Sequence, residues 1–181
     1  CKLFISQSHD EYWSKEQRLH VTAARDNGMH LAFLSGNEIF WKIRWENNFR
    51  TMVVCKDSQE TKQIDPVEWT GTWRDDRPIN TFGAKPENEL TGTLFTVNAW
   101  RHDALEIPSK YANHRFWRHT HIARLKAGSD AKAVLLSGLL GHEWDEDIDN
   151  GFRPAGLQHL SETTIDNVVY LMDEGSVYDS G

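Results

Sequence analysis

The stretch "LFISQSHDEYWSKEQRLHVTAARDNGMHLAFLS", Leu3–Ser35, decides the predicted fold. Its first residues form a short apolar strand. Ser14 and Gln17 have the spacing of a capping box, which starts a helix, and Gly28 supplies the left-handed residue that ends it. A second apolar strand follows at His30–Ser35. A strand, a helix and a strand within about thirty residues indicate a βαβ unit with parallel pairing.

The rest of the chain adds strands to this unit. Between Trp41 and Glu46, apolar and charged residues alternate, which is typical of a half-buried strand, and a turn leads into a second strand at Thr51–Lys56. This pattern predicts a β-hairpin in place of a second crossover. The apolar run Ala133–Gly141 predicts a further buried strand. We therefore expect an α/β protein built around a parallel sheet.

The sequence also predicts how the chain is divided. Residues 57–113 hold four of the five prolines and many turn residues, so we expect a loop-rich insertion there. A strand begins almost at Cys1, and no closing element is evident at the other end. We expect residues 1–181 to be part of one α/β domain, truncated at both ends. The alternative is that Cys1 was exposed by self-cleavage and is an N-terminal nucleophile.

Composition excludes several classes of protein. The chain has 181 residues, of which 39% are hydrophobic and 26% charged, as in a globular domain. Its net charge of −7 argues against a nucleic-acid partner, and no apolar run has the length of a membrane span. Cys1 and Cys55 are expected to be reduced thiols, and we expect a cytoplasmic protein.

Polar clusters follow three of the predicted strands. The motif "SHDEYW" contains His9 and Tyr12, and "SGNEIFW" contains Asn37. The motif "GHEWDEDIDN" places Glu143 directly after an apolar strand, where partial burial raises the pKa of a carboxyl or requires a cation. Ligands of open α/β sheets bind at the carboxyl ends of the strands. These clusters are therefore where we expect a site.

Other motifs give weaker signals. His119 and His121 lie two apart and are a possible metal pair, but no third ligand follows at a diagnostic spacing, so a polar strand edge is favoured. The turn "LSGNE" lacks the G-x-S-x-G pattern of a nucleophile elbow. The chain contains no P-loop, no G-x-G-x-x-G and no C-x-x-C. Phosphate, dinucleotide and thiol-redox chemistry are therefore not expected.

Four segments together resemble a known family. They are "SHDEYWS", "LAFLSGNEIFWKIRWE", "PENELTGTLF" and "GHEWDEDIDNGFRPAGLQHLSETT", and the likeness runs from about Leu3 to Thr164. The chain resembles the large (beta) subunit of N,N-dimethylformamidase and its relatives. The resemblance implies a flavodoxin-like, three-layer α/β core similar to class I glutamine amidotransferases without their catalytic cysteine. It also implies that the family's domain continues past the end of this chain.

The resemblance implies a mononuclear ferric (Fe3+) site held by two tyrosinates and one glutamate. Matched by motif, Tyr12 is a tyrosinate candidate and Glu143 the carboxylate candidate. The place of the second tyrosine is Phe40, which cannot bind a metal. His9 is a candidate ligand or general base, and Asn37 a candidate contact to the substrate or its oxyanion. A phenolate is a hard ligand that a strongly acidic cation such as Fe3+ favours.

Three functions remain open on these grounds. The first is a metal-dependent hydrolase that acts on an amide or related C–N bond of a small-molecule substrate. The second is a non-catalytic, amidotransferase-like domain that binds a ligand or serves as a scaffold in a larger protein. The third is a cofactor-free hydrolase that uses His9 with an acid, or Cys1 as the nucleophile. Phe40 and the lack of a nucleophile favour the second function. In each case we expect the chain to contact the remaining parts of its own polypeptide or another subunit, and neither nucleic acid nor a membrane.

Overall fold

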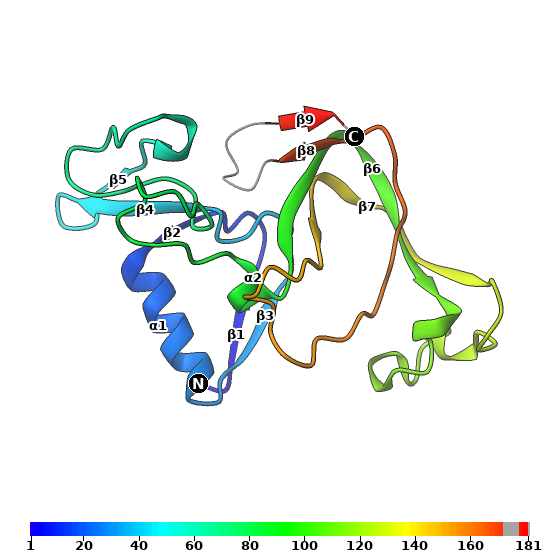
Figure 1. The fold of residues 1–181 in the computed structure, drawn as a ribbon. Coiled ribbons are helices and arrows are strands. Elements are labelled where there is room, and N and C mark those ends of the chain that lie inside the picture. The colour runs from blue at the N-terminus through cyan, green and yellow to red at the C-terminus, as the bar shows by residue number, and fades with distance from the viewer. Residues whose placement is uncertain (172–177, 181) are drawn as a thin grey trace.

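The computed structural model describes residues 1–171 and 178–180. Its elements are shown in Figure 1. The helices are α1 (Lys15–Asp26) and α2 (Asn88–Thr91), and short 3-10 turns lie at Asp57–Gln59, Ser109–Tyr111, Arg115–Trp117 and Ile122–Arg124. The strands are β1 (Leu3–Ser6), β2 (Tyr12–Ser14), β3 (His30–Phe33), β4 (Trp41–Glu46), β5 (Thr51–Val53), β6 (Leu94–Pro108), β7 (Lys132–Glu146), β8 (Val169–Leu171) and β9 (Tyr178–Ser180). No helix among the described residues is long and apolar enough to cross a membrane.

The first part of the chain forms the expected strand–helix–strand unit. The Ser14 hydroxyl accepts from the backbone N–H of Gln17 at 3.3 Å, and the Gln17 side chain accepts from the N–H of Ser14 at 2.8 Å. This capping box starts α1, and Gly28, with φ of +87°, lies just past its end. β1 precedes α1 in the sequence and β3 follows it, and the two strands pair in parallel. The local prediction is therefore confirmed.

The predicted flavodoxin-like, three-layer core is wrong. The parallel sheet stops at two strands, because β4 pairs in parallel with β2 instead of extending β1–β3. β4 also pairs with β5 as the expected antiparallel hairpin. The described strands form three small sheets and outnumber the helices, so the chain is a β-rich domain without the amidotransferase-like architecture.

A long antiparallel hairpin forms the other half of the molecule. β6 and β7 pair from Leu94 opposite Glu146 to Pro108 opposite Lys132, with β8 on the other side of β6. Figure 1 shows the hairpin curving away from α1. The run 133–141 was predicted to be a buried strand, yet Val134, Leu136 and Leu139 are exposed. An apolar run by itself does not distinguish a strand buried on both faces from one side of a hairpin.

Two clusters of buried apolar side chains hold these parts together. Trp13, Ile39, Trp73 and Leu90 pack where α1, β2 and α2 meet. Phe40, Trp41, Phe95 and Leu171 join the β2–β4 pair to β6 and β8, and Tyr12 packs against this second cluster. The second cluster therefore fixes the start of β2 against the long hairpin.

The segment 57–113 contains both loops and regular structure. Its loops are held by Asp57, whose carboxylate accepts backbone N–H groups of Ile64 at 2.7 Å and Thr70 at 2.7 Å. Its second half contains α2 and β6. That this segment is an insertion in a truncated domain stays a prediction.

Candidate functional site

Three segments that are distant in sequence meet beside the second apolar cluster. Backbone N–H groups of Ile39 and Trp41 donate to the carbonyls of Asp10 at 2.9 Å and Glu11 at 2.8 Å. The turn after β3 also contacts β7, because a Cβ at Gly36 would lie 2.5 Å from the Glu143 carbonyl oxygen. Only glycine fits such a close approach. Residues 10–12, 36–41 and 143–145 are thereby held together.

The turn after β3 has an unusual backbone. Asn37 has φ of +53° and Ile39 has φ of +59°, both in the left-handed region. Asparagine tolerates this region, whereas a β-branched residue there is a true outlier. Ile39 is fully buried, so packing against Trp13 and Trp73 holds it in place. Strained backbone of this kind occurs preferentially at binding and catalytic sites.

Asn37 lies at the centre of the three segments and is 1% exposed. Its Nδ2 donates to Glu143 Oε1 at 3.0 Å, and its backbone N–H donates to Asp145 Oδ1 at 2.8 Å. Its Oδ1 is buried and has no hydrogen-bond partner among the described residues. Because an unpaired buried acceptor is costly, this oxygen is suited to accept a hydrogen bond from a bound molecule.

Glu11 and Tyr12 share one electrostatic environment with Glu143. Burial raises the pKa of the Glu11 carboxyl, and the negative charge of Glu143 raises it further, against the charge of Lys56 and hydrogen bonds from Trp41 and Asn37. Burial likewise raises the pKa of the Tyr12 phenol, as do the charge of Glu11, a hydrogen bond to it and the charge of Glu143. We call Glu11, Tyr12, Asn37 and Glu143 the candidate site.

Two further carboxyl groups lie next to the candidate site. Glu38 is 2% exposed; its Oε1 accepts the Ser35 N–H at 2.7 Å, and its Oε2 has no partner among the described residues. Burial raises the pKa of Glu38 to about 7. Burial also raises the pKa of Asp145 to about 6, although Asn37 and Thr93 donate hydrogen bonds to it. Both groups can therefore change their protonation near neutral pH.

We expect a Glu38→Gln variant to be more stable than the parent chain at pH 8. Folding raises the pKa of the Glu38 carboxyl from its usual 4.5 to about 7. Between these two pH values the folded protein therefore keeps a proton on Glu38 that the unfolded chain releases. The resulting stabilisation is complete below about pH 4.5 and is lost as the pH rises through 7. Glutamine keeps the bond to Ser35 without the charge, and the gain at pH 8 should be about 1–3 kcal/mol.

Urea unfolding of the two proteins at pH 4.5 and pH 8 measures this difference. The matched control is Glu60→Gln, because Glu60 is exposed, and its stability should follow the parent at both pH values. An equal or lower stability of Glu38→Gln at pH 8 would contradict the expectation.

The structure brings three of the four predicted site residues together. Tyr12 lies at the start of β2, Asn37 in the turn after β3 and Glu143 in β7, and they are coupled as described above. His9 is exposed and makes no hydrogen bond or ion pair within the described part of the chain. His119 and His121 are exposed as well, and they lie among 3-10 turns instead of on a strand.

Three acidic residues near the site, Glu11, Glu38 and Asp145, were not among the predicted site residues. The available signal for Asp145 was its spacing of two residues from Glu143 on a strand, which places both on one face. For Glu38 the available signal was its position directly after Asn37 in the same turn. Only the meeting of the three segments shows that these carboxyl groups are neighbours.

Phe40 does not contribute to the candidate site. Its ring is 3% exposed and packs edge-on against Trp41 at 4.9 Å and Phe95 at 5.3 Å between centroids. The Arg74 guanidinium lies 5.1 Å from the centroid of the Phe40 ring. The position that the resemblance assigns to a second tyrosine is therefore part of the apolar core.

The remaining donors determine which metal would fit. No three His, Cys, Asp or Glu side chains within residues 1–171 and 178–180 form a group that could hold a metal ion. A cation at the candidate site would therefore need the phenol oxygen of Tyr12 together with Glu143, while Glu11 would balance its charge. All of these donors are oxygen atoms, and their mutual repulsion would be relieved by a cation. Oxygen donors of this kind are the ligands that hard cations such as Fe3+ prefer, but only two of the three ligands that the resemblance implies are present here.

Comparison of the sequence with known families gives one match. A family model described as N,N-dimethylformamidase beta subunit-like, C-terminal, matches residues 1–180. No curated protein matches the chain.

Proposed function

The chain belongs to the N,N-dimethylformamidase beta subunit-like family, and on that premise we propose that it hydrolyses an amide or a related C–N bond at the candidate site. One observation carries the proposal: Tyr12, Glu11 and Glu143 are electrostatically coupled around the buried amide of Asn37. In hydrolysis, water adds to the carbonyl carbon, the C–N bond breaks and the nitrogen leaves with a proton. The site must therefore orient the amide and move a proton.

Asn37 is suited to orient the substrate. Its Nδ2 is fixed by Glu143 at 3.0 Å, so its Oδ1 faces away from that contact without a partner among the described residues. This oxygen would accept a hydrogen bond from an amide N–H of the substrate. The strained turn and the bond from Asn37 N–H to Asp145 hold the acceptor in one position before the substrate arrives.

Glu11 is suited to move the proton. Burial and the charge of Glu143 raise its pKa, which makes its carboxylate a stronger base than one in water. In this proposal it takes a proton from the attacking water and returns it to the leaving nitrogen. Tyr12 and Glu143 would hold a hard cation, Fe3+ in this proposal, which would supply Lewis-acid polarisation of the substrate carbonyl.

The competing proposal is a ligand-binding domain without catalysis. It is favoured by Phe40, because a core phenylalanine stands where the resemblance implies a second tyrosinate. Both proposals use Asn37 as a binding residue, whereas only the first requires Tyr12 as a metal ligand.

A Tyr12→Phe variant is therefore expected to lose both metal and activity. The protein loaded with Fe3+ should show a visible phenolate-to-metal absorption band and should hydrolyse small N-alkyl formamides. Tyr12→Phe should lose the band and about 10²-fold or more in kcat/KM, because one hard ligand is removed. The measurements are visible absorption, iron content and release of the amine.

The matched control is Tyr111→Phe, since Tyr111 bonds to Glu162 in a different part of the molecule. It should keep the band and the activity. A protein that binds amides but neither takes up iron nor hydrolyses them, with Tyr12→Phe unchanged, would support the ligand-binding domain instead.

A further inference from the structure

A recess lies beside the long hairpin. Its volume is about 530 Å³, and it is bounded by β6 and β7 on one side and by residues 157–165 on the other. Figure 1 shows the segment between β7 and β8 passing back across the hairpin. Pockets that bind small molecules measure about 300–1,000 Å³. The recess is therefore large enough for a ligand of that class.

Most of the wall of this recess is apolar. Val97 and Trp144 belong to a buried cluster between β6 and β7, and Leu140 and Ile165 pack against them. All four line the recess. Trp144 alternates along β7 with Glu143 and Asp145, whose side chains bond to Asn37. Trp144 therefore faces away from the candidate site, whereas Asp145, which also lines the recess, lies at the border between the two.

One end of the recess is acidic. Asp145, Glu146, Asp147 and Glu162 all line it. Asp147 is paired with Arg153 Nη2 at 2.7 Å and with His159, and Glu162 is paired with Lys110 Nζ at 2.6 Å. Those two charges are therefore balanced within the protein.

The other two carboxyl groups are in no such pair, although the charge of Arg74 acts on Asp145. Asp145 accepts from the Asn37 N–H and from the Thr93 hydroxyl at 3.1 Å, and Glu146 accepts from the Thr96 hydroxyl. These donors are neutral. Among the described residues neither carboxyl group makes an ion pair. The recess thus combines an apolar wall with an end at which two carboxyl groups have no ion-pair partner among the described residues.

We propose that this recess binds a small amphipathic amine, with its apolar part against Leu140 and Trp144 and its protonated nitrogen at Asp145 and Glu146. A cationic N–H donor satisfies the two carboxyl groups, and an apolar chain or ring fills the remaining volume. A neutral ligand leaves the charges unbalanced, and an anionic ligand is repelled. The inference does not depend on hydrolysis at the candidate site, since it concerns binding alone.

Isothermal titration calorimetry with three matched probes tests the charge preference. The probes are 4-phenylbutylammonium, 4-phenylbutanol and 4-phenylbutyrate, which share one apolar part. We expect the ammonium to bind about tenfold or more tighter than the alcohol, as for a hydrogen bond to a charged group, and the carboxylate to bind weakest. Binding of the alcohol or the carboxylate as tight as that of the ammonium, or no binding of any probe, would overturn the proposal.

Variants then locate the bound probe. Glu146→Gln should reduce the preference for ammonium over alcohol by about threefold or more, whereas the exposed Asp130→Asn should leave it unchanged. Ile165→Trp should fill the recess and weaken both probes by about tenfold, in contrast to Leu135→Trp on the exposed side of β7. Circular dichroism confirms that each variant is folded. Unchanged preference in Glu146→Gln would show that the ammonium binds elsewhere and would overturn the proposal.

Discussion

A Glu143→Gln variant is expected to lose about 10²–10⁴-fold in kcat/KM for C–N bond hydrolysis. Glutamine has the same shape, and its Oε1 can still accept from Asn37 Nδ2, which bonds to Glu143 at 3.0 Å. What it lacks is the negative charge. The charge of Glu143 raises the pKa of Glu11 and of Tyr12, and in the proposed function Glu143 is also a ligand of the cation. The variant therefore removes charge without removing the contact.

A pH titration of the metal-free protein distinguishes this effect from simple loss of structure. Without the Glu143 charge, the pKa of Glu11 should fall, which NMR of its side-chain carboxyl carbon measures. Asp149→Asn is the matched control, because Asp149 is exposed in the same acidic stretch. Parent-like kcat/KM in Glu143→Gln would show that the reaction does not use the candidate site.

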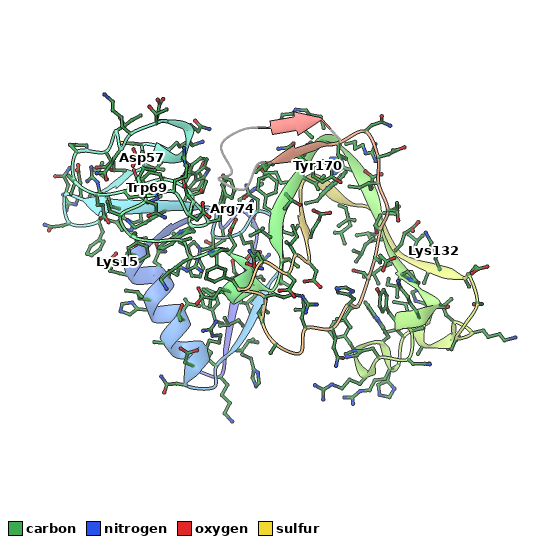
Figure 2. All side chains as sticks on the ribbon, viewed as in Figure 1. Lys15, Asp57, Trp69, Arg74, Lys132 and Tyr170 are labelled. Carbon is green, nitrogen blue, oxygen red and sulfur yellow. The ribbon has the colours of Figure 1, made fainter. Side chains whose placement is uncertain are left out.

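Arg74→Met is expected to destabilise the fold by about 3–5 kcal/mol. Figure 2 shows Arg74 near the middle of the molecule, between the part that contains α1 and the long hairpin. Its Nη2 donates to Glu87 Oε1 at 2.5 Å and to the Phe95 carbonyl at 2.6 Å. The side chains of Arg74 and Glu87 are 4% and 2% exposed. Methionine retains the volume but leaves the Glu87 carboxylate buried without a cation.

A double-mutant cycle separates the pair from its surroundings. Arg74→Met with Glu87→Leu removes both charges, so the double variant should be more stable than Arg74→Met alone. Urea unfolding measures both. The matched control is Lys132→Met, because Lys132 pairs with Glu106 at the surface, with side chains 49% and 26% exposed, and should cost about 1 kcal/mol or less. The expectation would be contradicted if Arg74→Met, like the control, lowered the free energy of unfolding by only about 1 kcal/mol or less.

The arrangement around Arg74 also bears on the candidate site. Its guanidinium lies against the Phe40 ring, and its positive charge opposes the rise in the pKa of Asp145, which bonds to the Asn37 N–H. Loss of Arg74 should therefore disturb the turn that positions Asn37 as well as the core.

The sequence by itself determined the local structure and the family. Ser14 and Gln17 cap α1 as expected, and the alternation after Trp41 predicts the β4–β5 hairpin. These features depend on hydrogen bonds and side-chain spacing within a few residues, which the sequence shows directly. Four segments together identified the family that the family model also matches. The same segments contain Tyr12, Asn37 and Glu143, which the structure brings together.

Only the tertiary structure decided which strands pair and which carboxyl groups are neighbours. The βαβ pattern is compatible with a large parallel sheet, but β4 pairs with β2, and the apolar run 133–141 pairs with β6 in an exposed hairpin. Pairing partners depend on long-range packing, which apolar periodicity does not specify. For the same reason, the position of Asp145 next to the candidate site follows only from the contact between β7 and the turn at Gly36. The interaction between two charged groups depends on their separation in space, which the fold determines and the sequence does not show.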